Sequence, residues 1–420
     1  MINSLSIAPP GTARKPSVLL VAPFYPPAFK GGVARLYDCL CSSITEFDVT
    51  VLADTIGAAP EAVAAFDAQA RESGYNMRRT RELVLHFPDG APWMKLLHMR
   101  AYLRNAKRDF AAAIAATNPD IIICGNSYPC GWLFLKLPRE RRWVNYVLGE
   151  EMTMNLEYGP IARWFKRTQL KALRRSWLNI AISQFSADKV TEAAGAPPEQ
   201  TILLPCPVDT RRFRPPEDRD GDRKRLGWTG KTVLLTVARL VNRKGIDNVL
   251  RALHATESLP RNFQYAIAGT GPQEKSLRAL CAEFGMEGRV EFMGFVPDDL
   301  LPSVYGAADV FVQANRAVDG DTEGFGIVYL EANACGLPVI GGTAGGTADA
   351  IEEGVSGLRV DGDSVDAIRG AIEKLLLNPD ARAAMAATAQ KRALDDFSLA
   401  AIAARLEATV TEVLKMPVRR

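Results

Sequence analysis

Short apolar runs of strand length alternate with amphipathic helical stretches along this chain from residue 18 onward. The first half carries such runs at residues 18–22, 48–53, 83–86, 120–124, 142–147 and 178–182, and the second half at residues 232–238, 264–269, 289–293, 309–312 and 338–340. Strands that alternate with helices form parallel sheets whose two faces are covered by helices. The alternation therefore predicts an α/β fold with doubly wound sheets.

Two domains suit the length of 420 residues, because a single hydrophobic core rarely grows so large. Residues 211–225, between the two series of strands, are rich in Pro, Arg and Asp and nearly free of apolar side chains, which predicts a linker outside any core. We expect a first Rossmann-like domain over residues 1–205 on the acceptor side, a second over 206–397 on the donor side, and a C-terminal helix over 398–420 that packs back on the first domain. Ligands would bind in the central cleft, where strand-to-helix turns meet.

The composition excludes several other classes of protein. Lys and Arg number 51 against 48 Asp and Glu, and this net charge of +3 predicts no nucleic-acid partner. Seven scattered cysteines without a C-x-x-C pair indicate reduced thiols and no zinc site. The first apolar run is too short for a signal peptide or a membrane span. We therefore expect a cytoplasmic protein.

A glycine turn between two glutamates, over residues 321–332, is the most informative motif. We expect a helix to begin near Gly326, so that the backbone N–H groups of Phe325, Gly326 and Ile327 point into the cleft and favour a phosphate or a sugar oxygen. Glu323 before the helix and Glu331 within it could each accept hydrogen bonds from the adjacent hydroxyls of a ribose or a sugar ring. Taken alone, the pair fits equally an acid on the surface and an acid on a helix face.

Two further strand-to-helix turns carry phosphate-binding features. Arg239 ends an apolar run and Lys244 precedes a helix, with no acidic residue nearby in the sequence, which suits a diphosphate. Either cation alone could be a solvated loop charge. Gly31 and Gly32 follow the first strand, where glycine lets the backbone approach a phosphate closely. Tight packing is the alternative explanation for this glycine pair.

Together these motifs resemble glycosyltransferase family 4, the retaining group 1 glycosyl transferases, over almost the whole chain. The resemblance is most specific over residues 239–245 and 323–357. It implies the GT-B fold, in which two Rossmann-like domains face a central cleft. It also implies transfer of a sugar from a UDP, GDP or ADP donor to a glycan or a polyprenyl-linked glycan, in the assembly of cell-surface polysaccharide.

The resemblance implies roles for the residues of these motifs. Arg239 and Lys244 would hold the donor diphosphate, Glu331 would bind the ribose, and Glu323 would contact the transferred sugar, so that Glu323, Arg239 and Lys244 carry catalysis. The backbone from Phe325 to Ile327 would assist Glu323.

The opposite domain and the base-binding loop complete the implied donor site. Gly31 and Gly32 would close on the diphosphate, and the backbone around Gly294 and Val296 would contact the base. The family uses neither a cofactor nor a metal ion, because the cations and the helix N-termini neutralise the leaving diphosphate.

One position departs from the family pattern. Leu148 stands where similar proteins often have a histidine that contacts the donor. Glu150 and Glu151, further along, could supply a polar contact to the donor or the acceptor, or they could cap the following segment.

Two basic segments with interleaved apolar side chains, residues 95–108 and 163–175, fit either contact with an anionic membrane surface or a solvated helix face. The protein would then lie peripherally on the inner face of the membrane. Two other functions stay open: a nucleotide-sugar epimerase of the same fold, and a catalytically silent nucleotide-sugar-binding subunit.

Overall fold

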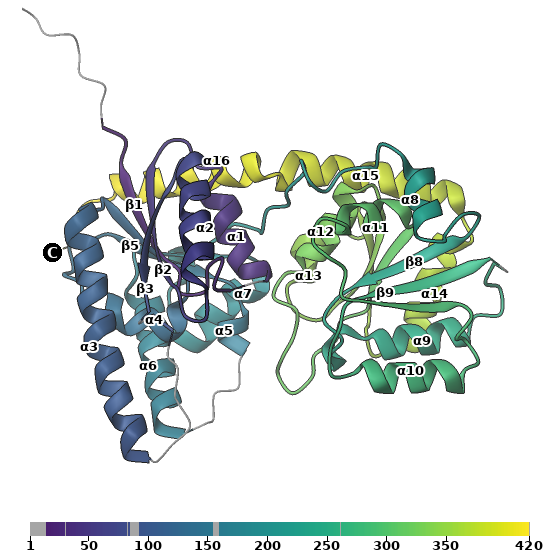
Figure 1. The fold of residues 1–420 in the computed structure, drawn as a ribbon, viewed down its shortest axis with the longest axis horizontal. Helices are drawn as coiled ribbons and strands as arrows, with labels where there is room; N and C mark the ends of the chain where they lie inside the picture. The colour runs from purple at the N-terminus through teal and green to yellow at the C-terminus, as the bar shows by residue number, and fades with distance from the viewer. Residues whose placement is uncertain are drawn as a thin grey trace, which may run out of the picture.

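The computed structural model describes residues 14–29, 31–81, 83–84, 92–153, 159–260 and 262–419. In this part of the chain two parallel sheets lie side by side, each covered by helices, and the long C-terminal helices run along one side of both (Figure 1). A doubly wound α/β fold is therefore confirmed.

The first sheet has seven strands in the order β3-β2-β1-β4-β5-β6-β7. Its strands are β1 (Ser17–Val21), β2 (Asp48–Asp54), β3 (Asn76–Thr80), β4 (Ile121–Cys124), β5 (Trp143–Val147), β6 (Leu178–Ala181) and β7 (Thr201–Leu203). Its helices are α1 (Gly32–Cys41), α2 (Pro60–Glu72), α3 (Pro92–Thr117), α4 (Ser127–Phe134), α5 (Glu150–Thr153), α6 (Gly159–Arg175) and α7 (Gln184–Lys189). Leu19 of β1 lies opposite Thr50 of β2 on one side and Ile122 of β4 on the other.

The second sheet has six strands in the order β10-β9-β8-β11-β12-β13. Its strands are β8 (Thr232–Val237), β9 (Phe263–Ala268), β10 (Val290–Gly294), β11 (Val310–Gln313), β12 (Val339–Gly342) and β13 (Gly357–Val360). Its helices are α8 (Arg219–Arg225), α9 (Ile246–His254), α10 (Glu274–Glu283), α11 (Leu301–Ala307), α12 (Ile327–Ala334), α13 (Thr347–Ala350), α14 (Val365–Leu376) and α15 (Pro379–Phe397).

The strand orders place a topological switch point between β1 and β4 in the first sheet and between β8 and β11 in the second. Ligands of doubly wound sheets bind at the carboxyl ends of the strands that flank this point. The turns after these four strands are therefore where the site should lie.

The two halves are joined near residues 206–209 and 397–398. The backbone N–H of Val208 donates to the carbonyl of Phe397 at 2.8 Å, and α16 (Leu399–Lys415) then returns over the first sheet (Figure 1). There the Glu407 carboxylate accepts from the backbone N–H groups of Thr45 and Glu46, at 2.5 and 2.7 Å.

The strand predicted at residues 83–86 is wrong. The edge strand β3 lies earlier, at Asn76–Thr80, and its polar sequence hides it. Leu83 and Val84 instead form a bend in which both backbone N–H groups donate to the buried Asp54 carboxylate, at 2.9 and 2.8 Å. Residues 85 and 86 lie outside the described part. Strands β7 and β13 were not predicted.

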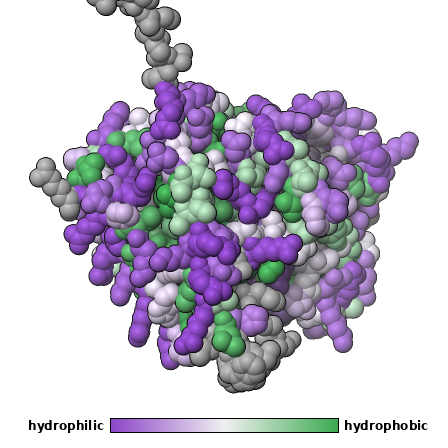
Figure 2. Space-filling view, turned by 60° about the vertical axis from the view of Figure 1, so that its left-hand side comes forward, coloured by the Kyte–Doolittle hydropathy of each residue, from purple (hydrophilic) through white to green (hydrophobic). Residues whose placement is uncertain are grey.

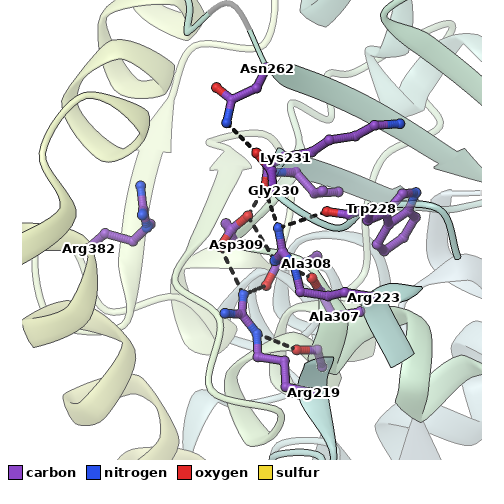
Figure 3. A network of polar contacts seen from close by, with 12 residues as sticks. Arg219, Arg223, Trp228, Gly230, Lys231, Asn262, Ala307, Ala308, Asp309 and Arg382 are labelled. Carbon is purple, nitrogen blue, oxygen red and sulfur yellow. Dashed lines mark hydrogen bonds and ion pairs between the residues drawn. The ribbon is translucent and has the colours of Figure 1, made fainter. Parts of the chain in front are cut away.

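Residues 219–225 are not the free linker that their composition predicts. They form α8, and its Arg223 is only 8% exposed. Arg219 and Arg223 donate to Asp309, at 2.8 and 3.3 Å, and to the carbonyl groups at the end of α11 (Figure 3). Charged side chains thus attach this helix to the second sheet, because clustered carbonyl groups and a carboxylate satisfy the guanidinium groups.

Candidate functional site

The turn after β1 brings an open glycine pair to the edge of the first sheet. Gly31, with φ 134°, precedes α1, and Gly32 is its first residue. Among the described residues, no heavy atom other than those of the chain neighbours would lie within 4 Å of a Cβ added at either position. Tight packing is therefore not the reason for the pair. The backbone of Gly31 explains one glycine, and the open space beside Gly32 leaves room for a ligand.

The turn after β11 places Glu323 at the centre of a charged cluster. The Glu323 Oε2 atom accepts from Lys244 Nζ at 2.5 Å, from Arg243 Nη1 at 3.1 Å and from Gln313 Nε2 at 3.2 Å. Arg243 also pairs with the exposed Asp321 at 3.0 Å. The expectation that Lys244 lacks an acidic neighbour is thus wrong, because β8 and β11 are adjacent and bring Glu323 to it.

The cluster keeps Glu323 ionised. Burial alone would raise the pKa of this carboxyl, but the charges and hydrogen bonds of Lys244 and Arg243 outweigh burial and lower the pKa below its usual range. Glu323 is therefore an anion at neutral pH, with three donors on one of its oxygens.

Arg239 differs from Lys244. It follows β8 and is exposed, and within the described part of the chain it has no acidic partner. Its charge is available to an anionic ligand, as the sequence predicts.

A helix N-terminus faces the same place. Gly326, with φ 94°, precedes α12, whose first residue is Ile327, so the predicted start of this helix is confirmed. Within the described residues, the backbone N–H groups of Phe325, Gly326 and Ile327 have no acceptor. The turn itself is fixed, because Gly346 donates from its backbone N–H to the Glu323 carbonyl at 2.8 Å.

Glu331 lies one turn along α12. Its carboxylate accepts from the Tyr305 hydroxyl at 2.8 Å. Burial raises the pKa of Glu331, and the Tyr305 hydrogen bond and the charges of Arg212 and Arg35 oppose this rise. The Arg35 guanidinium pairs with Asp298 at 2.8 Å, so α1 and the loop after β10 meet near Glu331.

The predicted base-binding loop follows β10. Gly294 has φ 66°, and a Cβ there would meet no heavy atom within 4 Å. Val296 is half-buried against the larger core cluster, whereas the neighbouring Phe295 is 74% exposed.

The segment after β5 contacts the glutamate turn. A Cβ added at Gly324 would lie 2.8 Å from the Leu148 carbonyl oxygen, and the Leu148 side chain is buried. The Leu148 backbone N–H donates to Glu151 Oε1 at 3.0 Å, so Glu151 binds the backbone two residues before α5. Of Glu150, only the backbone is described. Ser183 adds a second link, from its hydroxyl to the Gly324 carbonyl at 2.8 Å.

The site thus brings Gly31, Gly32, Arg239, Lys244, Glu323 and Glu331 to the carboxyl ends of the strands at both switch points. Sequence reasoning missed Arg243 and Tyr305. The position of Arg243 beside Lys244 is a weak signal, whereas Tyr305 carries none.

Comparison with known proteins decides the family. The model of Glycosyltransferase Family 4 matches residues 30–212, and that of Glycosyl transferases group 1 matches residues 218–392. A GDP-mannose-dependent alpha-(1-6)-phosphatidylinositol monomannoside mannosyltransferase of Mycolicibacterium smegmatis is 32% identical over 354 residues, which cover 82% of this chain and 85% of that protein. The chain belongs to glycosyltransferase family 4. It is a nucleotide-sugar-dependent glycosyltransferase.

Other proteins match in part or in fold. A putative colanic acid biosynthesis glycosyltransferase, WcaL of Salmonella typhimurium, is 31% identical over 189 residues, 44% of each chain. The structure of Anabaena HepE with UDP is similar over 94% of this chain and 100% of that chain, with a TM-score of 0.71 and 20% identity. Sucrose-phosphate synthase of Thermosynechococcus elongatus, with a TM-score of 0.73 and 21% identity, matches over 95% of this chain and 99% of that chain. These structures confirm the GT-B fold.

None of the described helices is long and apolar enough to span a membrane. All seven cysteines are free thiols.

Proposed function

We propose that this glycosyltransferase moves a hexosyl group from a GDP-sugar to a hydroxyl group of a lipid-linked glycan, with retention at the anomeric carbon and without a metal ion. One observation carries the proposal: Lys244 and Glu323 are joined at 2.5 Å between adjacent strand ends, beside an exposed Arg239 and the free N–H groups of α12. The Mycolicibacterium smegmatis relative, named for GDP-mannose and a glycolipid, supports the choice of donor and acceptor.

The donor diphosphate would bind between Arg239, Lys244 and the N-terminus of α12. Arg239 and the N-terminus of α12 donate to the phosphate oxygens. The Lys244 ammonium has three donors, so it can serve a phosphate while it keeps its bond to Glu323. These groups stabilise the negative charge of the leaving diphosphate, as a divalent cation does in other enzymes.

The remaining contacts orient the donor. Glu331 would accept from the ribose hydroxyl groups, and Gly32 leaves space for the diphosphate on the opposite side of the cleft. The base would lie along the backbone that follows Gly294.

The reaction needs no side-chain base. The bond between the anomeric carbon and the leaving phosphate oxygen breaks, and the acceptor oxygen forms its bond to the same face of the sugar. The proton of the acceptor hydroxyl passes to the leaving phosphate oxygen. The Glu323 carboxylate, held ionised by Arg243 and Lys244, stabilises the positive charge that develops on the sugar.

Calorimetric titration tests the donor. The protein is titrated with GDP, UDP and ADP and their sugar conjugates in buffer with a chelator, and in parallel as the Glu331→Gln variant. Tight binding of GDP that the variant loses supports the proposal. Preference for UDP or ADP would refute the proposed donor, and no binding at all would favour a silent subunit. The anomeric configuration of the product, read by NMR, tests retention.

The acceptor reaches the protein, in this proposal, from an anionic membrane surface. On α6 the cations Arg163, Arg167 and Lys171 are exposed at a spacing of four residues, which places them on one helix face. The exposed Trp164 lies beside them, 40% exposed. Figure 2 brings the left-hand side of Figure 1 forward, and on the face that it shows the coloured hydrophobic groups lie in small areas among hydrophilic ones. Charge rather than deep insertion would therefore hold the protein to lipid.

Half of the basic residues of this segment have structural partners. Lys166, Arg174 and Arg175 donate to backbone carbonyl groups of neighbouring segments. They are not part of the proposed membrane surface.

Vesicle sedimentation separates the membrane contact from net charge. The triple Gln variant of Arg163, Arg167 and Lys171 should leave vesicles that contain anionic lipid. The control removes the same charge from the second half, at the exposed residues Lys224, Lys275 and Lys374. Equal binding of the two variants would refute the membrane surface.

A further inference from the structure

Asn126 lies at the switch point of the first sheet, and no motif of the sequence draws attention to it. It follows β4, which is the neighbour of β1, so the turn that carries Asn126 and the turn that leads to Gly31 flank the same point at the carboxyl edge of the sheet. Gly125, just before it, packs against Tyr37 of α1: a Cβ there would lie 3.1 Å from the Tyr37 ring. The turn is thereby fixed beside the helix that starts at the open glycine pair.

The side chain of Asn126 does not cap the helix that follows it. Asn126 precedes α4, where an asparagine oxygen usually accepts from a backbone N–H of the first helical turn. It makes no such bond, although the residue is only 6% exposed. Its Oδ1 atom is buried and has no hydrogen-bond partner within the described part of the chain. A buried acceptor left without a donor costs about 1–3 kcal/mol, so a native structure that keeps one calls for a reason.

A second unpartnered oxygen lies close by. Gln169 of α6 is fully buried and its Oε1 atom has no donor among the described residues. Its Nε2 atom donates to the hydroxyl of Ser127, the residue after Asn126, at 3.1 Å, and to the Glu151 carbonyl at 3.3 Å. Ser127, next to Asn126 in the chain, is thus bonded to a second amide whose oxygen has no donor among the described residues.

This group of residues is connected to the reaction centre. The Glu151 carboxylate holds the Leu148 backbone N–H at 3.0 Å, and the carbonyl of Leu148 lies against Gly324, next to Glu323. The chain of contacts from Asn126 to the glutamate turn is thus continuous and crosses from the first sheet to the second.

We infer that Asn126 belongs to a subsite for the hydroxyl groups of the glycosyl acceptor, and that Asn126 Oδ1 accepts a hydrogen bond from one of them. Ser127 and Gln169, which are fully buried and bonded to each other at 3.1 Å, hold the turn that carries Asn126. The inference rests on the proposed function. Neutral amide oxygens suit O–H donors, and a sugar or another polyol ring presents several hydroxyl groups at fixed spacing. Asn126 is a positioning residue: it orients the acceptor toward the anomeric carbon near Glu323 and takes no proton, because an amide oxygen is a very weak base.

The proposed acceptor subsite is tested by measuring transfer of the sugar to an acceptor separately from hydrolysis of the donor by water. GDP-mannose is supplied with methyl α-mannoside or myo-inositol as the probe acceptor, and both the glycoside product and free mannose are measured. Asn126→Leu should raise the KM of the acceptor at least tenfold, while the KM of GDP-mannose and the rate of donor hydrolysis stay within twofold. Asn126→Asp and Asn126→Ser keep an oxygen at this position and should recover part of the transfer.

The outcomes are distinguishable. Wild-type protein that neither binds nor turns over GDP-mannose would refute the proposed donor and the inference with it. Normal turnover by the wild type, with an unchanged ratio of transfer to hydrolysis in Asn126→Leu, would refute the subsite alone. That result, with a melting temperature below that of the wild type, would show that the oxygen only holds a buried water. Equal losses of transfer and hydrolysis in all three variants would show a structural role.

Discussion

Arg243 should control the ionisation of Glu323, and the Arg243→Met variant tests this. Arg243 donates to Glu323 Oε2 at 3.1 Å, and the two side chains are only 16% and 13% exposed. A hydrogen bond to a charged group contributes about 1.5–3 kcal/mol, which is about 10- to 150-fold in an equilibrium. The second pair of Arg243, with the 60% exposed Asp321, contributes far less. Most of the effect of the variant should therefore come from Glu323.

The sign of the pH effect follows from the direction of the pKa. In the native protein the pKa of Glu323 lies below its usual range, so its ion pairs add stability above the unfolded carboxyl pKa of about 4.3, and this stability is lost as the pH falls through the folded pKa. Without Arg243, Lys244 still opposes the effect of burial, but the charge and hydrogen bond of Arg243 are lost and the pKa of Glu323 rises. The carboxylate then takes up a proton at a higher pH than in the wild type.

The assay is kcat as a function of pH between 4.5 and 8.5, with the KM of the donor measured at each pH. The acid limb of kcat should move to higher pH in Arg243→Met, with the largest loss at the acid end. The KM of the donor should change little, because Arg239 and Lys244 remain. Asp321→Asn is the matched control and should leave the profile unchanged. A wild-type profile with a raised donor KM would refute the reasoning and show that Arg243 binds the donor itself.

Three further predictions follow from other parts of the structure. Arg223→Met should lower the free energy of unfolding by about 1–3 kcal/mol in urea, because it leaves buried carbonyl groups without a donor while Arg219 still pairs with Asp309. Arg225→Met, at a 68% exposed side chain, should cost less than 1 kcal/mol, and similar costs would contradict the buried role of α8. Gly32→Ala should leave the melting temperature within about 2 °C, because no atom lies near its Cβ, yet weaken GDP binding in calorimetry at least tenfold, and unchanged binding would exclude a close approach of the ligand. Tyr305→Phe removes the hydroxyl that opposes the raised pKa of Glu331, so GDP affinity should fall more at pH 5.5 than at pH 8; a uniform loss would mean that the hydroxyl contributes only packing.

The fold could be predicted because buried parallel strands are continuous apolar runs. The central strands β1 and β4 are almost entirely aliphatic, and all of their residues except Ser17 are buried. The edge strand β3 has neighbours on one side only and reads Asn-Met-Arg-Arg-Thr, so no apolar pattern marks it. The helix α8 was missed for a related reason: its buried face is made of Arg223 and Asp222, and composition cannot distinguish such a face from a solvated linker.

The sequence indicates individual residues of the site, but it does not indicate which of them contact each other. Glu323 and Lys244 each lie in a recognisable turn, yet they are 79 positions apart, and their ion pair follows only from the adjacency of β8 and β11. For the same reason Lys244 looked unpaired in the sequence. Asn126 could not be singled out, because a lone asparagine after a strand usually caps the next helix, and only its unpartnered oxygen shows otherwise.

Leu148 stands where similar proteins often have a histidine, and the contacts that hold this position are made by its backbone. The N–H of Leu148 binds Glu151 and its carbonyl contacts Gly324, and both interactions are open to any residue. The approach of the first sheet to the glutamate turn therefore does not depend on the histidine. The Glu151 carboxylate, however, is engaged by that same backbone N–H and is a poor substitute for a ligand contact. In the proposed acceptor subsite, the unpartnered oxygen of Asn126, after β4, supplies the polar contact from the first sheet to the bound sugar.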